Sequence, residues 1–134
     1  KMKKYLWLTT LFLTSISFAA QLTPVKAEAE RCEYYQTKNN KNPTGKAIAV
    51  DSSNDSGDEI LYLGLDNKET KFKLQNRDFD NGIDYWKNGN TSLVFKQIKI
   101  LNAPDNSGKY LESLTLKTNN QIIIKQNLLR ICED

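Results

Sequence analysis

The chain has 134 residues, of which 19 are Lys or Arg and 16 are Asp or Glu, and it contains no histidine. The absence of histidine excludes Ser-His-Asp and Cys-His catalysis and the usual histidine ligands of zinc, so an enzyme would depend on carboxylate pairs, Lys or Tyr. The length suits a single domain.

The first segment has the layout of a secretory leader. A lysine pair opens it, residues 5–20 form an apolar stretch, and Ala27-Glu28-Ala29 supplies a small-x-small cleavage signal. A membrane anchor is the alternative, but the stretch contains five Ser or Thr residues and is shorter than the roughly 20 apolar residues that span a bilayer. We therefore predict a signal peptide over residues 1–29, cut after Ala29 or alternatively after Ala27, and no membrane span after cleavage.

Removal of this leader changes the charge balance. Residues 1–29 contain four basic residues and one acidic residue, so residues 30–134 carry 15 of each and are formally neutral. Nucleic-acid binding needs a surplus of Lys and Arg on one face. We therefore expect no nucleic-acid partner.

Two cysteines, Cys32 and Cys132, lie near opposite ends of the remaining chain. An even number of cysteines in an oxidising compartment indicates a disulfide, and no Cys-x-x-Cys redox motif is present. We predict that this bond ties the first strand to the last, with a chain-entropy stabilisation of at most roughly 4.7 kcal/mol. Such a cross-link favours a closed sheet in which the two strands are neighbours.

Short segments with strand patterns follow one another to the end of the chain. Residues 70–75 are the clearest, because Phe72 and Leu74 alternate with polar residues. Polar loops separate the segments, and Pro43 argues against a central strand in the first loop. Residues 30–134 are thus predicted to form one all-β domain, a small antiparallel barrel or sandwich of about eight strands. The expected strands are 32–37, 46–50, 60–65, 70–75, 83–87, 93–100, 109–118 and 121–124, with a continuation at 128–132.

The longest expected arm, 93–100, places its apolar residues on two faces. Leu93 and Phe95 share one face, whereas Ile98 and Ile100 share the other. A bulge near residues 96–97 is expected to let both sets reach one core.

A hairpin centred on Asn88-Gly89 carries the best binding candidates. Asn-Gly is favoured in tight turns whose central residues both take positive φ. Adjacent strand residues point to opposite faces, so one of Tyr85 and Trp86 is exposed beside Lys87 and Asn88. Exposed aromatic residues next to turns are typical of recognition surfaces. The alternative is that Trp86 is a core anchor and Tyr85 only flanks it.

The acidic loop before this hairpin does not fit a calcium site. A loop starting at Asp78 would place Gly82 at a ligand position and Gly89 at the twelfth position, where a Glu is needed. Asp80 and Asp84 add carboxylates, but a chain of this size seldom forms a cleft that holds an acid pair for catalysis. We expect no metal, no other cofactor and no enzymatic activity.

Residues 82–89 carry a pattern known from another family. Gly82-Ile83-Asp84-Tyr85 has a Gly-x-x-Tyr spacing, and the segment from Tyr85 to Gly89 is similar to aromatic-Trp-x-Lys-Gly. In these features the chain resembles the periplasmic and membrane-bound inhibitors of C-type lysozyme. Asn81 stands where that family has a Ser, Lys87 comes one place early, and the two motifs overlap. The resemblance implies an exported eight-stranded antiparallel barrel with a terminal disulfide that inhibits lysozyme.

These features predict an exported protein, periplasmic or secreted, that acts as a binding module. Its ligand would be a protein or glycan of the cell envelope, recognised through the hairpin tip, and lysozyme inhibition is one specific version. The alternative is an envelope-associated structural protein without a small-molecule ligand, which would associate through exposed strand edges.

Overall fold

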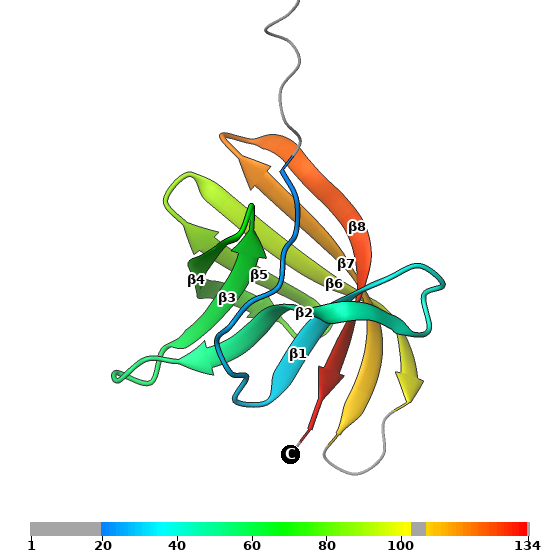
Figure 1. Cartoon of the computed structure of the whole chain (residues 1–134). Coiled ribbons are helices and arrows are strands. Elements are labelled where there is room, and N and C mark those ends of the chain that lie inside the picture. Colours follow the sequence, from blue (N-terminus) through cyan, green and yellow to red (C-terminus); the bar gives the residue numbers. More distant parts are fainter. Residues whose placement is uncertain (1–19, 103–106, 134) are drawn as a thin grey trace, which may run out of the picture.

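The fold is a closed antiparallel β-barrel of eight strands (Figure 1). The computed structural model describes residues 20–102 and 107–133, and these two ranges contain no helix. Within them, accordingly, no helix has the length and apolar character to cross a membrane. The prediction of a small all-β fold is confirmed, and of the two predicted architectures the barrel is the correct one.

Several strands extend beyond the ranges expected from the sequence. The second strand begins at Pro43, although we expected this residue to argue against a strand. It is the first residue of the strand, where a missing N–H is tolerated. The last strand runs without interruption to Cys132. The strands are β1 (Cys32–Thr37), β2 (Pro43–Ser53), β3 (Glu59–Leu65), β4 (Lys68–Asp78), β5 (Ile83–Asn88), β6 (Thr91–Asn102), β7 (Gly108–Thr118) and β8 (Gln121–Cys132).

The first and last strands close the barrel. β1 pairs antiparallel with β8, and Cys32 lies directly opposite Cys132 in the register. The two cysteines form the predicted disulfide, with their Cα atoms 4.0 Å apart. The covalent link therefore joins the two strands at the position where the sheet closes.

Two-residue turns join β3 to β4, β5 to β6 and β7 to β8 at the end of the barrel opposite the C-terminus. The pairs Asp66-Asn67 and Asn119-Asn120 have positive φ at both residues, as type I′ turns require. The turn after β5 differs from the expectation, because Asn88 belongs to β5 and only Gly89, with φ 57°, is left-handed. The turn is therefore centred on Gly89 and Asn90, and positive φ at the first central residue alone is the pattern of a type II′ turn.

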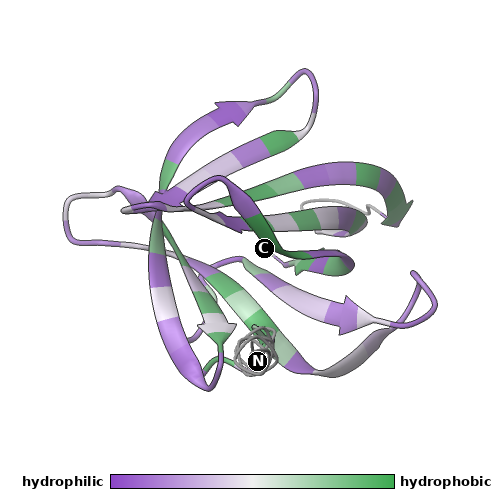
Figure 2. Ribbon diagram, turned by 90° about the horizontal axis from the view of Figure 1, so that it is seen from above, coloured by the Kyte–Doolittle hydropathy of each residue, from purple (hydrophilic) through white to green (hydrophobic). Residues whose placement is uncertain are grey.

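The core occupies the barrel interior through alternate residues of each strand. Leu93 and Phe95 on β6 face Leu114 and Leu116 on β7, and all four are buried. Figure 2 shows this alternation as hydrophobic and hydrophilic bands along the strands. Trp86 on β5 is among the largest fully buried side chains. The period-two pattern thus defines one inner face on every strand.

A bulge interrupts the pairing of β6 with β7. The register shifts between Gln97 and Lys99, one residue beyond the predicted position. Ile98 and Ile100 are nevertheless 52 % and 55 % exposed, so the expectation that they reach the core is wrong. A closed barrel has one inner face, and within residues 20–102 and 107–133 these two side chains lie on the outer face.

Residues 20–31, which we call the N-terminal strap, run along β2 and β3 from one end of the barrel to the other (blue in Figure 1). Thr23 N donates to Gly64 O of β3, and Val25 N donates to Ala47 O of β2, both at 3.0 Å. Part of this strap lies in the range that we predict to be removed with the leader.

Candidate functional site

A cavity of about 290 Å³, which we call the mouth, lies at the end of the barrel where β8 finishes. Residues from all eight strands line it. The other end is the one joined by tight turns. Five carboxylates and three guanidinium groups line the mouth, namely Asp51, Glu59, Asp78, Asp84, Glu112, Arg31, Arg77 and Arg130.

The charged residues occupy the same inward positions that carry apolar residues deeper in the barrel. Glu112 comes two residues before buried Leu114 on β7, and Arg130 two residues after buried Leu128 on β8. Because side chains alternate along a strand, positions two apart share one face. The inner face therefore changes from apolar to charged toward the mouth.

Glu112 and Arg130 form the deepest charged pair. Arg130 Nε lies 2.8 Å from Glu112 Oε2, although its N–H is not directed at that oxygen, and the guanidinium carbon lies 4.6 Å from the centre of the Tyr110 ring. Burial raises the pKa of Glu112 to about 7, and the positive charge of Arg130 opposes this shift without cancelling it. The pKa of Arg130 is raised as well, because the Glu112 charge outweighs the lowering by burial. Glu112 therefore titrates near neutral pH.

Arg77 forms the second charged cluster at the mouth. Its guanidinium group donates two hydrogen bonds of 3.0 Å to the carboxylate of Glu59 and others, of 2.9 and 3.3 Å, to that of Asp84. Burial lowers the pKa of Arg77, but these two carboxylates outweigh the burial and raise it. Phe79, which is 82 % exposed, lies at the rim with its ring 5.9 Å from this guanidinium carbon.

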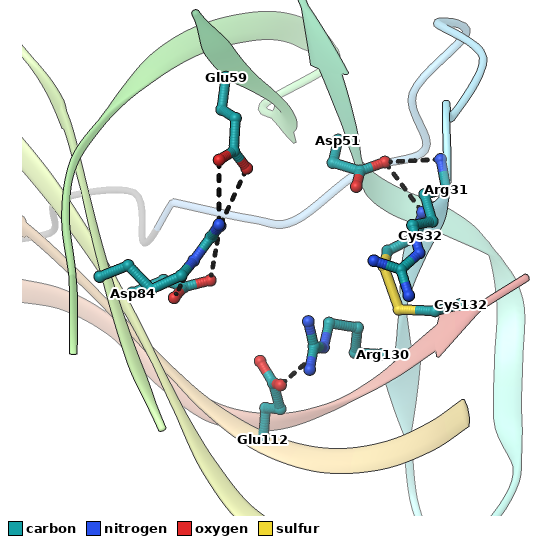
Figure 3. The surroundings of a disulfide bond; sticks show 9 residues. Arg31, Cys32, Asp51, Glu59, Asp84, Glu112, Arg130 and Cys132 are labelled. Atoms are coloured by element: carbon teal, nitrogen blue, oxygen red, sulfur yellow. Dashed lines mark hydrogen bonds and ion pairs between the residues drawn. A yellow bond between two sulfur atoms is a disulfide. The ribbon is translucent and has the colours of Figure 1, made fainter. Parts of the chain in front are cut away.

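Asp51 anchors the end of the strap beside the disulfide (Figure 3). One of its carboxylate oxygens accepts hydrogen bonds from the backbone N–H groups of Arg31 and Cys32, at 3.0 and 2.9 Å. Glu133 N, directly after the end of β8, donates to Arg31 O at 2.9 Å. These contacts fix the rim where the strap, β1 and β8 meet.

Aromatic residues form the floor of the mouth. Tyr34 and Phe95 are stacked with ring centroids 4.6 Å apart. Burial raises the pKa of the Tyr34 hydroxyl, so it stays protonated at neutral pH. Trp86 also contributes to the lining, and its buried Nε1–H has no hydrogen-bond partner. An unpaired buried donor costs about 1–3 kcal/mol, and a ligand acceptor would satisfy it.

The lining of the mouth contains more carboxylates than guanidinium groups. Within the described residues, no group of three or more Asp, Glu, Cys or His side chains is placed to hold a metal ion. Two of the three guanidinium groups already pair with carboxylates, which outnumber them. The cavity therefore presents a negative, hydrogen-bonding wall above an aromatic floor.

Three of the four predicted binding residues, Tyr85, Trp86 and Lys87, line a second cavity of about 360 Å³ together with residues of β4 and β6, and Asn88 does not. Trp86 is 2 % exposed and lies in the core, as the alternative interpretation predicted, whereas Tyr85 is 37 % exposed on the outer face. Lys87 and Asn88 are exposed near the end with the tight turns, where the Asn88 side chain donates to Lys71 O. Of these four residues, only Trp86 contributes to the mouth.

The two segments that resemble the lysozyme-inhibitor motifs lie at opposite ends of β5. Asn81 is in the turn before β5, at the mouth end, where its side chain donates to Asp78. Lys87 lies near the far end of the same strand. Six strand residues span about 20 Å, so a surface that contacts both segments would extend along the outside of the barrel.

Arg77, Glu112 and Arg130 were not among the residues predicted from the sequence. The available signal was the position of Glu112 and Arg130 two residues from apolar neighbours, on the side of the strand expected to be buried. The pairing of β4 with β5 shifts register between Leu74 and Asn76. Simple alternation from Phe72 and Leu74 would therefore place Arg77 on the outer face, whereas it lines the mouth.

We compared the chain with family models, with curated proteins and with solved structures, and nothing in the three comparisons matches it.

Proposed function

We propose that the protein is an exported binding module whose mouth takes up a small, polar, positively charged molecule of about the size of a monosaccharide. The observation that carries this proposal is the excess of carboxylates over guanidinium groups in a partly enclosed cavity. Its volume of about 290 Å³ is near the lower end of small-molecule sites, which begin at roughly 300 Å³. An amino sugar has this size, this charge and many hydroxyl groups.

The energetic cost of the mouth supports a functional interpretation. A buried ion pair is often no better for stability than apolar residues of the same volume, because both charges lose their hydration. Glu112 and Arg130 could therefore be replaced by packed apolar side chains without loss of the fold. Perturbed carboxylates beside a cavity are typical of functional sites. The buried pair and the unpaired Trp86 Nε1–H suit a ligand that brings its own donors and acceptors.

The disulfide supports export. Cysteine pairs form and persist in oxidising compartments and are rare in the cytosol. The pairing of Cys32 with Cys132 is consistent with a protein of the periplasm or the extracellular space. Amino sugars belong to the glycans of the cell envelope, so compartment and ligand chemistry agree.

Calorimetric titration with glucosamine, glucose and gluconate tests this function. These molecules are similar in size and differ in charge, so a negative mouth is expected to bind glucosamine best and gluconate worst. Glu112→Gln is expected to weaken glucosamine binding by about tenfold. Glu33→Gln is the matched control, because Glu33 does not line the mouth. A preference for gluconate, or no binding of any of the three, would overturn the proposal.

A further inference from the structure

The N-terminal strap is part of the barrel's hydrogen-bonded structure. Gln21 and Asp66 are joined by two hydrogen bonds of 2.9 Å, from Gln21 N to the Asp66 side chain and from Asp66 N to Gln21 O. Asn67 N donates to the Thr23 hydroxyl at 2.9 Å. One Glu69 carboxylate oxygen accepts from the backbone N–H groups of both Lys26 and Ala27. The strap therefore satisfies donors and acceptors along β2, β3 and the start of β4.

The strap also covers apolar surface. Ala20 and Leu22 pack against the central core cluster, and Leu22 forms an antiparallel bridge with Leu65 at the end of β3. Pairing between β2 and β3 covers only residues 49–53 of β2, and the strap bonds to Ala47, before that range. The strap thus completes the sheet where β2 and β3 are not paired with each other.

Gly64 shows how closely the strap approaches β3. A Cβ atom built at this position would lie 1.8 Å from Thr23 O and 3.1 Å from Pro24 O. Only a glycine leaves room for this backbone approach. The sequence of β3 is therefore adapted to the presence of residues 23–24.

From these contacts we infer that the leader is removed between Ala19 and Ala20, so that the strap remains in the exported protein. Ser17-Phe18-Ala19 is a small-x-small signal at the end of the apolar stretch. Hydrolysis of the Ala19–Ala20 peptide bond gives Ala20 a free amino group. A cut after Ala27 or Ala29 would instead remove the residues that bond to Gly64, Asp66 and Asn67.

The mass of the exported product tests this assignment. The full chain is expressed in a bacterium with its leader intact, and the purified protein is analysed by intact-mass and N-terminal peptide mass spectrometry. The expected product begins at Ala20. A product that begins at Glu28 or Glu30, or one that retains the leader, would overturn the inference.

Two matched substitutions separate the alternatives. Ala19→Lys places a charge at the last residue before the proposed cut and is expected to abolish processing there. Ala27→Lys changes the last residue before a cut after Ala27 and the third residue before a cut after Ala29, so it blocks both of those sites. Full processing of the Ala27→Lys chain together with failure of the Ala19→Lys chain supports the inference. The reverse result contradicts it.

Discussion

Glu112 and Arg130 face each other across β7 and β8 inside the barrel, where the apolar core gives way to the charged mouth. The Glu112 side chain is 6 % exposed, so protein groups stabilise its negative charge more than water does. Burial is the main cause that raises its pKa, Arg130 lowers it, and the charge of Asp84 adds to the rise. The ionisation of this single carboxyl group therefore couples the stability of the barrel to pH.

Stability is expected to fall as the pH rises from about 4.5 to about 7. The pKa of Glu112 is about 7 in the folded protein and near 4.5 in the unfolded chain. Between these values the folded state holds a proton that the unfolded state has lost, so deprotonation favours unfolding. The free energy of unfolding is expected to fall by at most about 3 kcal/mol across this window. Urea unfolding at a series of pH values measures it, and Glu112→Gln is expected to remove the fall. A slope that persists in this variant would show that another group is responsible.

Removal of the disulfide is expected to destabilise the barrel strongly. The bond closes a loop with a sequence separation of 100 residues, for which the chain-entropy model gives at most about 4.7 kcal/mol. This is a large share of the 5–15 kcal/mol that stabilises a typical domain. Chemical unfolding of the double variant Cys32→Ser, Cys132→Ser, beside the reduced wild-type protein, measures the loss. Equal stability of the variant and the oxidised protein would contradict the prediction.

Gly64→Ala is expected to cost about 1–3 kcal/mol, because the new Cβ forces the strap away from β3. The same substitution in a chain that begins at Glu30 is the control, since Thr23 and Pro24 are then absent. The loss is expected to be much smaller there, and the difference between the two backgrounds is the coupling between Gly64 and the strap. Thermal unfolding of both chains, each with and without Gly64→Ala, measures this coupling. An equal loss of stability in the two backgrounds would argue against the close contact.

The resemblance to the inhibitors of C-type lysozyme predicts that an excess of the protein slows lysozyme. Lys87 is exposed at the end of β5, so Lys87→Ala is expected to weaken inhibition by removing a charge while leaving the core intact. Glu112→Gln, at the other end of the barrel, is expected to inhibit as the wild type does. Turnover of bacterial cell walls measured by turbidity checks this, and full lysozyme activity at micromolar excess would exclude the inhibitory function.

The all-β fold could be predicted from the sequence because its determinants are visible in the residue pattern itself. Phe72 and Leu74 alternate with polar residues, and Cys32 and Cys132 are placed to join the first strand to the last. The outward position of Ile98 and Ile100 could not be predicted, because it depends on the single inner face of a closed sheet.

The candidate site was harder to predict than the fold. A charged residue such as Glu112 or Arg130 on a strand is normally interpreted as solvent-exposed, and only the closed barrel brings these residues together. The hairpin residues drew attention because an exposed aromatic residue beside a turn suggests recognition, yet Trp86 points inward. The strap shows no strand periodicity, so its pairing with β2 and β3 follows from tertiary contacts alone.

The order of the strands has a consequence for folding kinetics. Seven of the eight strand pairings join neighbours along the chain, and these can form hairpin by hairpin with little loss of loop entropy. The pairing of β1 with β8 must instead bring together segments about 100 residues apart. A polypeptide whose cysteines are already oxidised starts with these two ends tethered. It should therefore refold from urea faster than the reduced polypeptide, because the slowest search has been completed before folding begins.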